Sequence, residues 1–159
     1  MRIRIGLAAV SLVGALISPN AASAAPLHAS EIHTDESDSL YVVAGNLYAA
    51  RHYREAIPLF ERVVELDPRH GNAYALLGGS YFHLGDYPRA ITSFEQALRL
   101  DEGIKLAYLG LVAANYMSEH VGMAQEWVRR LVPLLTGEER ERYLAMISAQ
   151  FPALDLSGT

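Results

Sequence analysis

A 34-residue internal repeat constrains the fold of this chain more than any other feature of its sequence. Residues 37–70 align with residues 71–104 without a gap. The identical pairs are Gly45/Gly79, Tyr53/Tyr87, Ala56/Ala90, Ile57/Ile91, Phe60/Phe94, Glu61/Glu95, Leu66/Leu100 and Asp67/Asp101. A period of this length is typical of proteins built by stacking one small structural unit.

A third copy of the repeat covers residues 105–138 in a weaker form. It keeps an aromatic, a leucine and an alanine in register, at Tyr108, Leu111 and Ala124. Asn115 stands where the second copy has a tyrosine, and Val128 stands where it has a phenylalanine. The third repeat is therefore degenerate.

Each repeat reads as two short amphipathic helices with a tight turn between them. In the second repeat the turn is predicted at residues 84–86, where Asp86 can cap the second helix and Pro88 sits in its first turn. Small residues at Gly78 and Ala90 allow the two helices to approach closely. The predicted inward face consists of Tyr74, Leu77, Gly78, Tyr81, Ala90, Phe94, Ala97 and Leu100.

The second repeat has, in order, an aromatic residue, a Leu-Gly pair, a tyrosine, an alanine, a phenylalanine and an alanine. These are Tyr74, Leu77-Gly78, Tyr81, Ala90, Phe94 and Ala97, and their spacing resembles that of the tetratricopeptide repeat. One departure is Glu102, where that family usually has a proline; Pro68 supplies it in the first repeat. The resemblance implies an all-α solenoid of three helix-turn-helix repeats, over residues 37–70, 71–104 and 105–138.

A C-terminal capping helix is predicted over residues 137–151. Thr136 to Glu139 has the form of a capping box, three residues after Pro133 ends the preceding helix. The apolar stripe of the capping helix is Tyr143, Leu144, Ile147 and Phe151. Pro152 ends the predicted domain of residues 37–152, and residues 153–159 are expected to be a disordered tail.

Residues 1–24 have the pattern of a cleavable secretory signal peptide. Arg2 and Arg4 precede an uncharged apolar run over residues 5–17, and Ala22-Ser23-Ala24 provides the cleavage site. The run is too short to span a bilayer, although an uncleaved anchor stays open as an alternative. Residues 25–36 lack periodicity and are predicted to be a flexible linker. The mature protein is therefore expected to be periplasmic or secreted, without a stable membrane anchor.

Composition excludes several classes of function. Cleavage after Ala24 leaves 11 basic and 18 acidic side chains, so nucleic acid is an unlikely partner for the mature chain. The chain has no cysteine, which excludes disulfides, thiol catalysis and thiolate metal sites.

No set of residues has the spacing of a catalytic or metal site, so no enzyme activity and no cofactor are predicted. His28 and His33 lie near acidic residues and leave weak metal binding open, but their spacing matches no ligand motif. The Leu-Gly-Gly-Ser at residues 77–80 falls mid-helix and is assigned a structural role.

The resemblance places the functional surface on the first helix of each repeat, which in this family lines a concave groove for a partner peptide. The main groove residues carried over are Tyr41, Val42, Tyr48, Asn72, Leu76, Phe82, His83, Leu109, Tyr116 and Met117. The wider set adds Asp38, Gly45, Ala49, Ala75, Gly79, Leu106, Gly110 and Ala113. The basic residues with which one family branch grips a C-terminal carboxylate are absent. Two alternatives stay open: packing of some of these side chains on neighbouring helices, and occupation of the groove by the linker.

Three functions fit this description of an apolar, aromatic groove. The first is a non-catalytic adaptor or scaffold of the cell envelope that binds an apolar segment of another protein. The second is a holdase or secretion chaperone, since the layout is similar to that of type III secretion translocator chaperones. The third is a regulatory subunit of an envelope biosynthesis enzyme. A fold by itself does not separate them.

Overall fold

The computed structural model describes residues 29–157, with the side chains of residues 36–157. The predicted signal peptide and residues 25–28 lie outside the described part of the chain. Seven α-helices and one short 3₁₀ helix follow one another, and residues 29–157 contain no strand. Their bounds are α1 Ala29–Ala49, α2 Tyr53–Leu66, α3 Gly71–His83, α4 Tyr87–Leu100, α5 Lys105–Met117, α6 Val121–Leu131, η1 Val132–Leu134 and α7 Gly137–Gln150.

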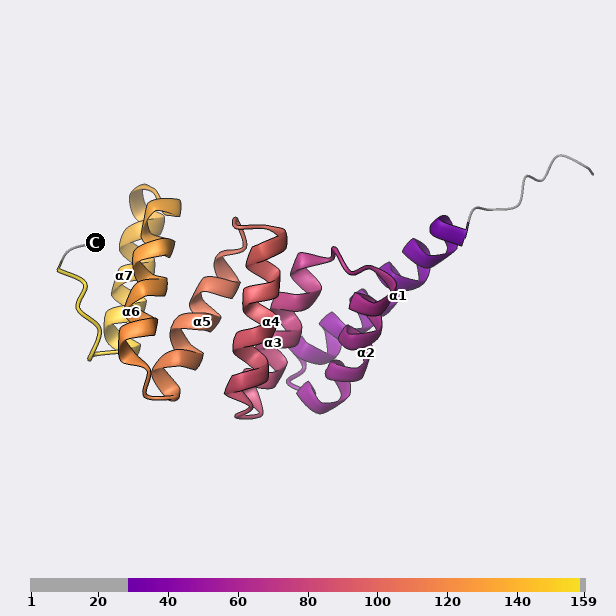
Figure 1. Cartoon of the computed structure of the whole chain (residues 1–159), viewed down its shortest axis with the longest axis horizontal. Helices are drawn as coiled ribbons and strands as arrows, with labels where there is room; N and C mark the ends of the chain where they lie inside the picture. The colour runs from indigo at the N-terminus through magenta and orange to yellow at the C-terminus, as the bar shows by residue number, and fades with distance from the viewer. Residues whose placement is uncertain (1–28, 158–159) are drawn as a thin grey trace, which may run out of the picture.

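The helices pair as α1 with α2, α3 with α4 and α5 with α6, and the pairs stack into an elongated solenoid with α7 at its end (Figure 1). Each pair corresponds to one 34-residue repeat of the sequence, although α1 begins before the first repeat, at Ala29. The predicted all-α class and helix-turn-helix arrangement are confirmed.

Equivalent positions of the three repeats form the core. Ala56, Ala90 and Ala124 are each fully buried where the two helices of a pair meet. Phe60, Phe94 and Val128 are buried four residues later, on the same helical face. The same 34-residue spacing therefore places like side chains in like surroundings.

Phe94 packs closely against two glycines. A Cβ added at Gly78 of α3 would stand 2.9 Å from the ring, and one added at Gly110 of α5 would overlap it. The ring thus lies between two glycines on neighbouring first helices. These glycines are required by close packing, since both lie inside helices where glycine is otherwise unfavourable.

The turns inside the repeats share a left-handed residue. Gly85 has φ +80°, and the residues 34 positions before and after it, Arg51 and Glu119, have φ +65° and +64°. The turn geometry is therefore repeated even where the sequence offers no glycine. A left-handed conformation is easy for glycine and costly for other residues.

The linker prediction is wrong for residues 29–36, because α1 begins at Ala29. No glycine or proline interrupts the chain between Ala29 and Ala44, so the helix of the first repeat extends backwards. The carboxylate of Glu36 lies 3.4 Å from the guanidinium of Arg62 on α2 and ties this extension to its neighbour.

The tail prediction is wrong for residues 153–157. Leu154 is buried, and the side-chain amide of Gln125 on α6 both accepts from the backbone N–H of Asp155 and donates to its carbonyl. One apolar side chain and two amide hydrogen bonds hold the segment against the end of the solenoid. The segment is too short to show a hydrophobic period, so the sequence did not predict this packing.

The predicted capping box at the start of α7 does not form. Thr136 occupies the N-cap position, but its side chain makes no capping hydrogen bond. The carboxylate of Glu139 instead pairs with Lys105 Nζ on α5, with the two atoms 2.5 Å apart. An ion pair between helices therefore replaces the local cap.

Candidate peptide-binding groove

The first helices of the three repeats and the capping helix α7 enclose a hollow of about 190 Å³, here called the inner hollow. It is lined by Tyr48 of α1, by Gly79, Phe82 and His83 of α3, by Leu106, Leu109, Gly110 and Ala113 of α5, by Met146 and Gln150 of α7, by Phe151 just after α7, and by Phe94 of α4. Apolar and aromatic groups predominate, as in sites that bind apolar ligands.

Four of the ten main groove residues predicted from the sequence meet at this hollow. They are Tyr48, Phe82, His83 and Leu109. Of the wider set, Gly79, Leu106, Gly110 and Ala113 line it as well. They come from three different helices, so the solenoid brings together residues that are up to 65 positions apart in the chain.

Two predicted aromatic groove residues pack on neighbouring elements instead. The ring of Tyr41 lies 4.4 Å from that of His70, at the start of α3, and 6.2 Å from that of Phe60 on α2. The ring of Tyr116 lies 5.0 Å from that of Phe151, just after α7. Both residues serve contacts between elements of the solenoid and do not line the inner hollow.

The remaining four predicted residues lie apart from the hollow. Val42, Asn72 and Met117 are exposed, while Leu76 is half-buried against the core. Val42 and Met117 are the apolar members of this exposed group; Val42 lies inside α1 and Met117 is the last residue of α5. They form no enclosed surface with the hollow.

The contribution of α7 was not foreseen. Met146, Gln150 and Phe151 close one side of the inner hollow. The sequence did show Phe151 in the apolar stripe of the capping helix, but that stripe was assigned to covering the last repeat. Lys105 pairs with Glu139 where α5 and α7 begin, and Tyr116 contacts Phe151 where they end, so α7 runs alongside α5 and its end reaches the hollow.

The polar groups of the inner hollow are held in aromatic contacts. The imidazole of His83 stacks on the ring of Tyr53, with centroids 4.3 Å apart and planes at 11°. Burial, and secondarily the Arg51 guanidinium, lower the pKa of His83 below its usual range. Tyr48 lies 5.4 Å from Tyr53, and burial raises the pKa of its phenol. A neutral, aromatic environment is thereby maintained at physiological pH.

The described residues contain neither a metal-binding cluster nor a membrane-spanning helix. Within residues 29–157, no three or more histidine and acidic side chains are grouped so as to hold a metal ion. Over the same range, no helix has the length and apolarity that crossing a membrane requires.

Comparison with known structures places this arrangement among helix-turn-helix solenoids. The first TPR domain of Spaghetti (RPAP3), solved bound to the HSP90 peptide SRMEEVD, has a TM-score of 0.64 at 20% identity, covering 75% of this chain and 95% of that one. The Yersinia enterocolitica type III secretion translocator chaperone SycD has a TM-score of 0.67 at 22% identity, covering 75% and 92%. The Arabidopsis OM64 TPR domain has a TM-score of 0.66 at 13% identity, covering 75% and 99%.

These likenesses establish the fold. Residues 44–117, from the middle of α1 to the end of α5, also match the family model for the tetratricopeptide repeat. This central part of the chain is therefore similar in sequence to tetratricopeptide repeats, and the whole described chain has their fold.

Proposed function

We propose that this protein is a non-catalytic interaction module that binds an apolar segment of a partner protein in the inner hollow. The observation that carries the proposal is the convergence of α1, α3, α5 and α7 on one apolar space. Large rigid aromatic side chains such as Tyr48 and Phe82 are the usual anchors of protein interfaces. No lining residue is a lysine, arginine or carboxylate, so binding rests on apolar contact.

The size of the hollow favours an extended segment with one large apolar anchor. An engineered apolar cavity of about 150 Å³ accepts a benzene ring, and the inner hollow measures about 190 Å³. It therefore suits a single phenylalanine, leucine or tryptophan side chain. A helical partner would need several anchor pockets in a row, spaced at helical intervals.

A C-terminal carboxylate is a poor ligand for this surface. The positions that would carry lysine, arginine and asparagine in the carboxylate-binding branch of the family are Tyr41, Gly45, Leu76, Leu106 and Gly110. The first RPAP3 domain binds the acidic peptide SRMEEVD. The present chain shares that fold but presents apolar side chains, so its ligand belongs to a different chemical class.

The site of action that we propose is the cell envelope or the medium, after export and cleavage following Ala24. The charged, apolar and small-residue order of residues 1–24 supports this. N-terminal sequencing of the protein from its native cell tests the proposal. A mature chain that starts at Ala25 is expected, whereas retention of Met1 on a cytoplasmic protein would overturn it.

Binding in the inner hollow is tested with short fluorescent peptides that differ only at one central residue: alanine, leucine, phenylalanine or tryptophan. Affinity measured by fluorescence anisotropy is expected to rise with the size of the apolar residue. Phe82→Ala enlarges the hollow and removes an aromatic contact, and is expected to weaken binding about tenfold or more. Ala113→Phe fills the hollow and is expected to abolish the preference for a large residue.

The matched control is Leu134→Ala, which removes an exposed apolar side chain on η1, away from the hollow. Circular dichroism of each variant verifies folding. If Leu134→Ala weakens binding as much as Phe82→Ala, or if all four peptides bind alike, the inner hollow is not the binding site. Selective binding of one peptide series favours an adaptor over a holdase, which would accept many unfolded segments.

A further inference from the structure

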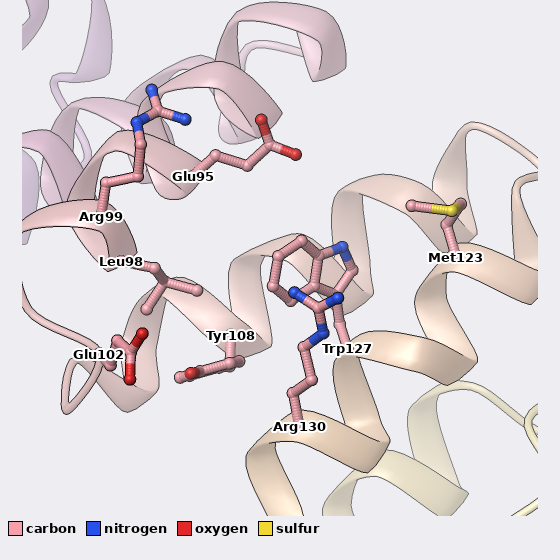
Figure 2. A pocket seen from close by; sticks show the side chains of 8 residues that line it. All are labelled: Glu95, Leu98, Arg99, Glu102, Tyr108, Met123, Trp127 and Arg130. Carbon is pink, nitrogen blue, oxygen red and sulfur yellow. The ribbon is translucent and has the colours of Figure 1, made fainter.

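A second and larger hollow, of about 480 Å³, lies between the second helices α4 and α6, with Tyr108 of α5 among its lining residues (Figure 2). We call it the outer hollow. It shares no lining residue with the inner hollow. The inner and outer hollows are therefore separate surfaces, and a substitution in the lining of one leaves the lining of the other unchanged.

The outer hollow arises from the degenerate third repeat. At the preceding junction, between α2 and α4, the phenol of Tyr81 donates to Glu61 Oε1 at 2.5 Å, and the Arg89 guanidinium lies 4.4 Å from the centre of the Tyr81 ring. These three side chains connect α2, α3 and α4. The Glu61 carboxylate thus has a hydrogen-bond donor within the protein, the phenol of Tyr81.

The corresponding residues 34 positions later are Glu95, Asn115 and Met123. Asn115 turns back on its own helix, where its amide donates to the carbonyl oxygen of Leu111 at 2.8 Å. Met123 carries no charge and is exposed. The carboxylate of Glu95 is therefore retained at the edge of the outer hollow without the phenol and the guanidinium that its counterpart has.

An aromatic wall faces this carboxylate. The indole of Trp127 and the ring of Tyr108 meet edge to face, with centroids 6.1 Å apart. The Arg130 guanidinium lies over the Trp127 ring, 4.8 Å from its centre, in a cation–π contact. Leu98 adds an apolar surface from α4.

The side chains without an ion pair at the outer hollow are two carboxylates and one guanidinium, so the excess charge is negative. Arg99 is hydrogen-bonded to the neutral amide of Gln96 and keeps its charge, whereas Arg130 is paired with Glu126 at 3.2 Å. Glu95 and Glu102 form no ion pair within the part of the chain described here. Burial, and secondarily the carboxylate of Glu102, raises the pKa of Tyr108, while the Arg130 guanidinium acts in the opposite direction.

We infer that the outer hollow is a docking site for a basic segment of a partner polypeptide. The aliphatic stem of a lysine or arginine lies along Leu98 and Trp127, and its cationic end pairs with Glu95, in the place of the missing phenol and guanidinium. A second basic side chain of the same segment pairs with Glu102. The net charge of the chain, −5, attracts such a segment over a longer range.

Trp127 is the only tryptophan of the protein, so its fluorescence reports directly on this site. The experiment titrates the full chain with a short oligolysine peptide and follows the indole emission. A saturable change is expected. Glu95→Gln combined with Glu102→Gln keeps the side-chain shapes and is expected to weaken the interaction about tenfold.

The matched control combines Glu55→Gln with Glu65→Gln. It removes the same two charges from the exposed side of α2, where each carboxylate is already paired within the protein, to His52 and Arg62. Binding by this control is expected to stay within about twofold of the unaltered chain. Phe82→Ala, which alters the inner hollow, is also expected to leave oligolysine binding unchanged.

Three results would overturn the inference. One is an equal loss of affinity in both double variants, which means that only net charge matters. Another is an absence of any fluorescence change with oligolysine. The third is stronger binding of an oligoglutamate peptide, which would make Arg99 and Arg130 the ligand-binding groups and the outer hollow an anion site.

Discussion

The phenol of Tyr81 on α3 donates a hydrogen bond to Glu61 on α2, with 2.5 Å between the two oxygens. The two residues belong to different repeats, so this contact links one structural unit to the next. Arg89 of α4 covers the same ring. The first two repeats are therefore joined by polar as well as apolar contacts, whereas the third repeat has Asn115 at the position of Tyr81.

Tyr81→Phe is expected to destabilise the protein by roughly 1 to 2 kcal/mol, because it removes a half-buried hydrogen bond to a charged acceptor while preserving the ring. Urea unfolding followed by circular dichroism measures the change. Tyr143→Phe on α7, whose phenol takes part in no hydrogen bond recorded within residues 29–157, is the control and is expected to be near neutral. Equal effects at the two positions would contradict the importance of the link to Glu61.

Gly110→Ala and Gly45→Ala are expected to have opposite effects. A Cβ at Gly110 overlaps the Phe94 ring, which is held in the core, so overpacking costs roughly 1 to 3 kcal/mol. A Cβ at Gly45 meets nothing within 4 Å, and alanine is the better helix former by about 0.5 to 1 kcal/mol. The free energies of unfolding of the two variants test this. Similar changes in both would mean that the Phe94 contact is misplaced.

Glu119→Gly is expected to stabilise the protein by up to roughly 1 kcal/mol. Glu119 has φ +64°, a conformation that costs a residue with a side chain about 1 kcal/mol or more and that glycine adopts freely. The greater flexibility of glycine in the unfolded chain offsets part of the gain. Gly85→Ala, at the equivalent turn with φ +80°, is expected to change the melting temperature in the opposite direction.

Leu154→Ala is expected to destabilise the protein by roughly 2 kcal/mol. The side chain is buried at the end of the solenoid, and its loss leaves a cavity beside the capping helix. Ser157→Ala, an exposed position in the same segment, serves as control and is expected to stay within about 0.5 kcal/mol of the unaltered chain. Thermal unfolding distinguishes a packed segment from a disordered tail, for which both changes would be neutral.

His83 is expected to make stability fall in mild acid. Its pKa is lowered in the folded state, first by burial and then by Arg51, so the unfolded chain takes up a proton more readily. The neutral imidazole therefore contributes its full stability above the ordinary histidine pKa of about 6.5, and the contribution is lost as the pH falls through the folded-state pKa.

The measurement compares the pH dependence of unfolding in the unaltered chain and in His83→Gln. The unaltered chain is expected to lose stability more steeply below about pH 6.5. The other described histidines are common to both proteins, so the difference between the two curves isolates His83. Parallel curves would show that burial of this imidazole has no consequence for folding.

The sequence by itself determined the repeat and almost everything local to it. Ala90 and Phe94 were identified as inward-facing from their spacing alone, and both are buried. Asp86 was expected to cap α4, and its carboxylate does accept from the backbone N–H of Arg89. Helix periodicity and capping depend on residues within a few positions of one another, which is why a single sequence reveals them.

Only the tertiary structure decided which of the groove residues face an open space. Tyr41 and Tyr116 looked like Tyr48 and Phe82 in the sequence, yet they pack on His70 and Phe151. The neighbours that decide this are about 30 residues away along the chain. Their directions depend on how successive helices stack, which no local pattern contains.

The two ends of the domain and the outer hollow were decided in the same way. Residues 29–36 and 153–157 lack a periodic pattern of their own. Their contacts include Glu36 with Arg62 on α2, two hydrogen bonds between Asp155 and Gln125 on α6, and the burial of Leu154. The sequence already showed that the third repeat has an asparagine, Asn115, at the position where the second repeat has Tyr81. That this exchange leaves Glu95 unpaired beside Trp127 follows from the packing of three helices, because a side chain's partners are set by the surfaces that folding brings together.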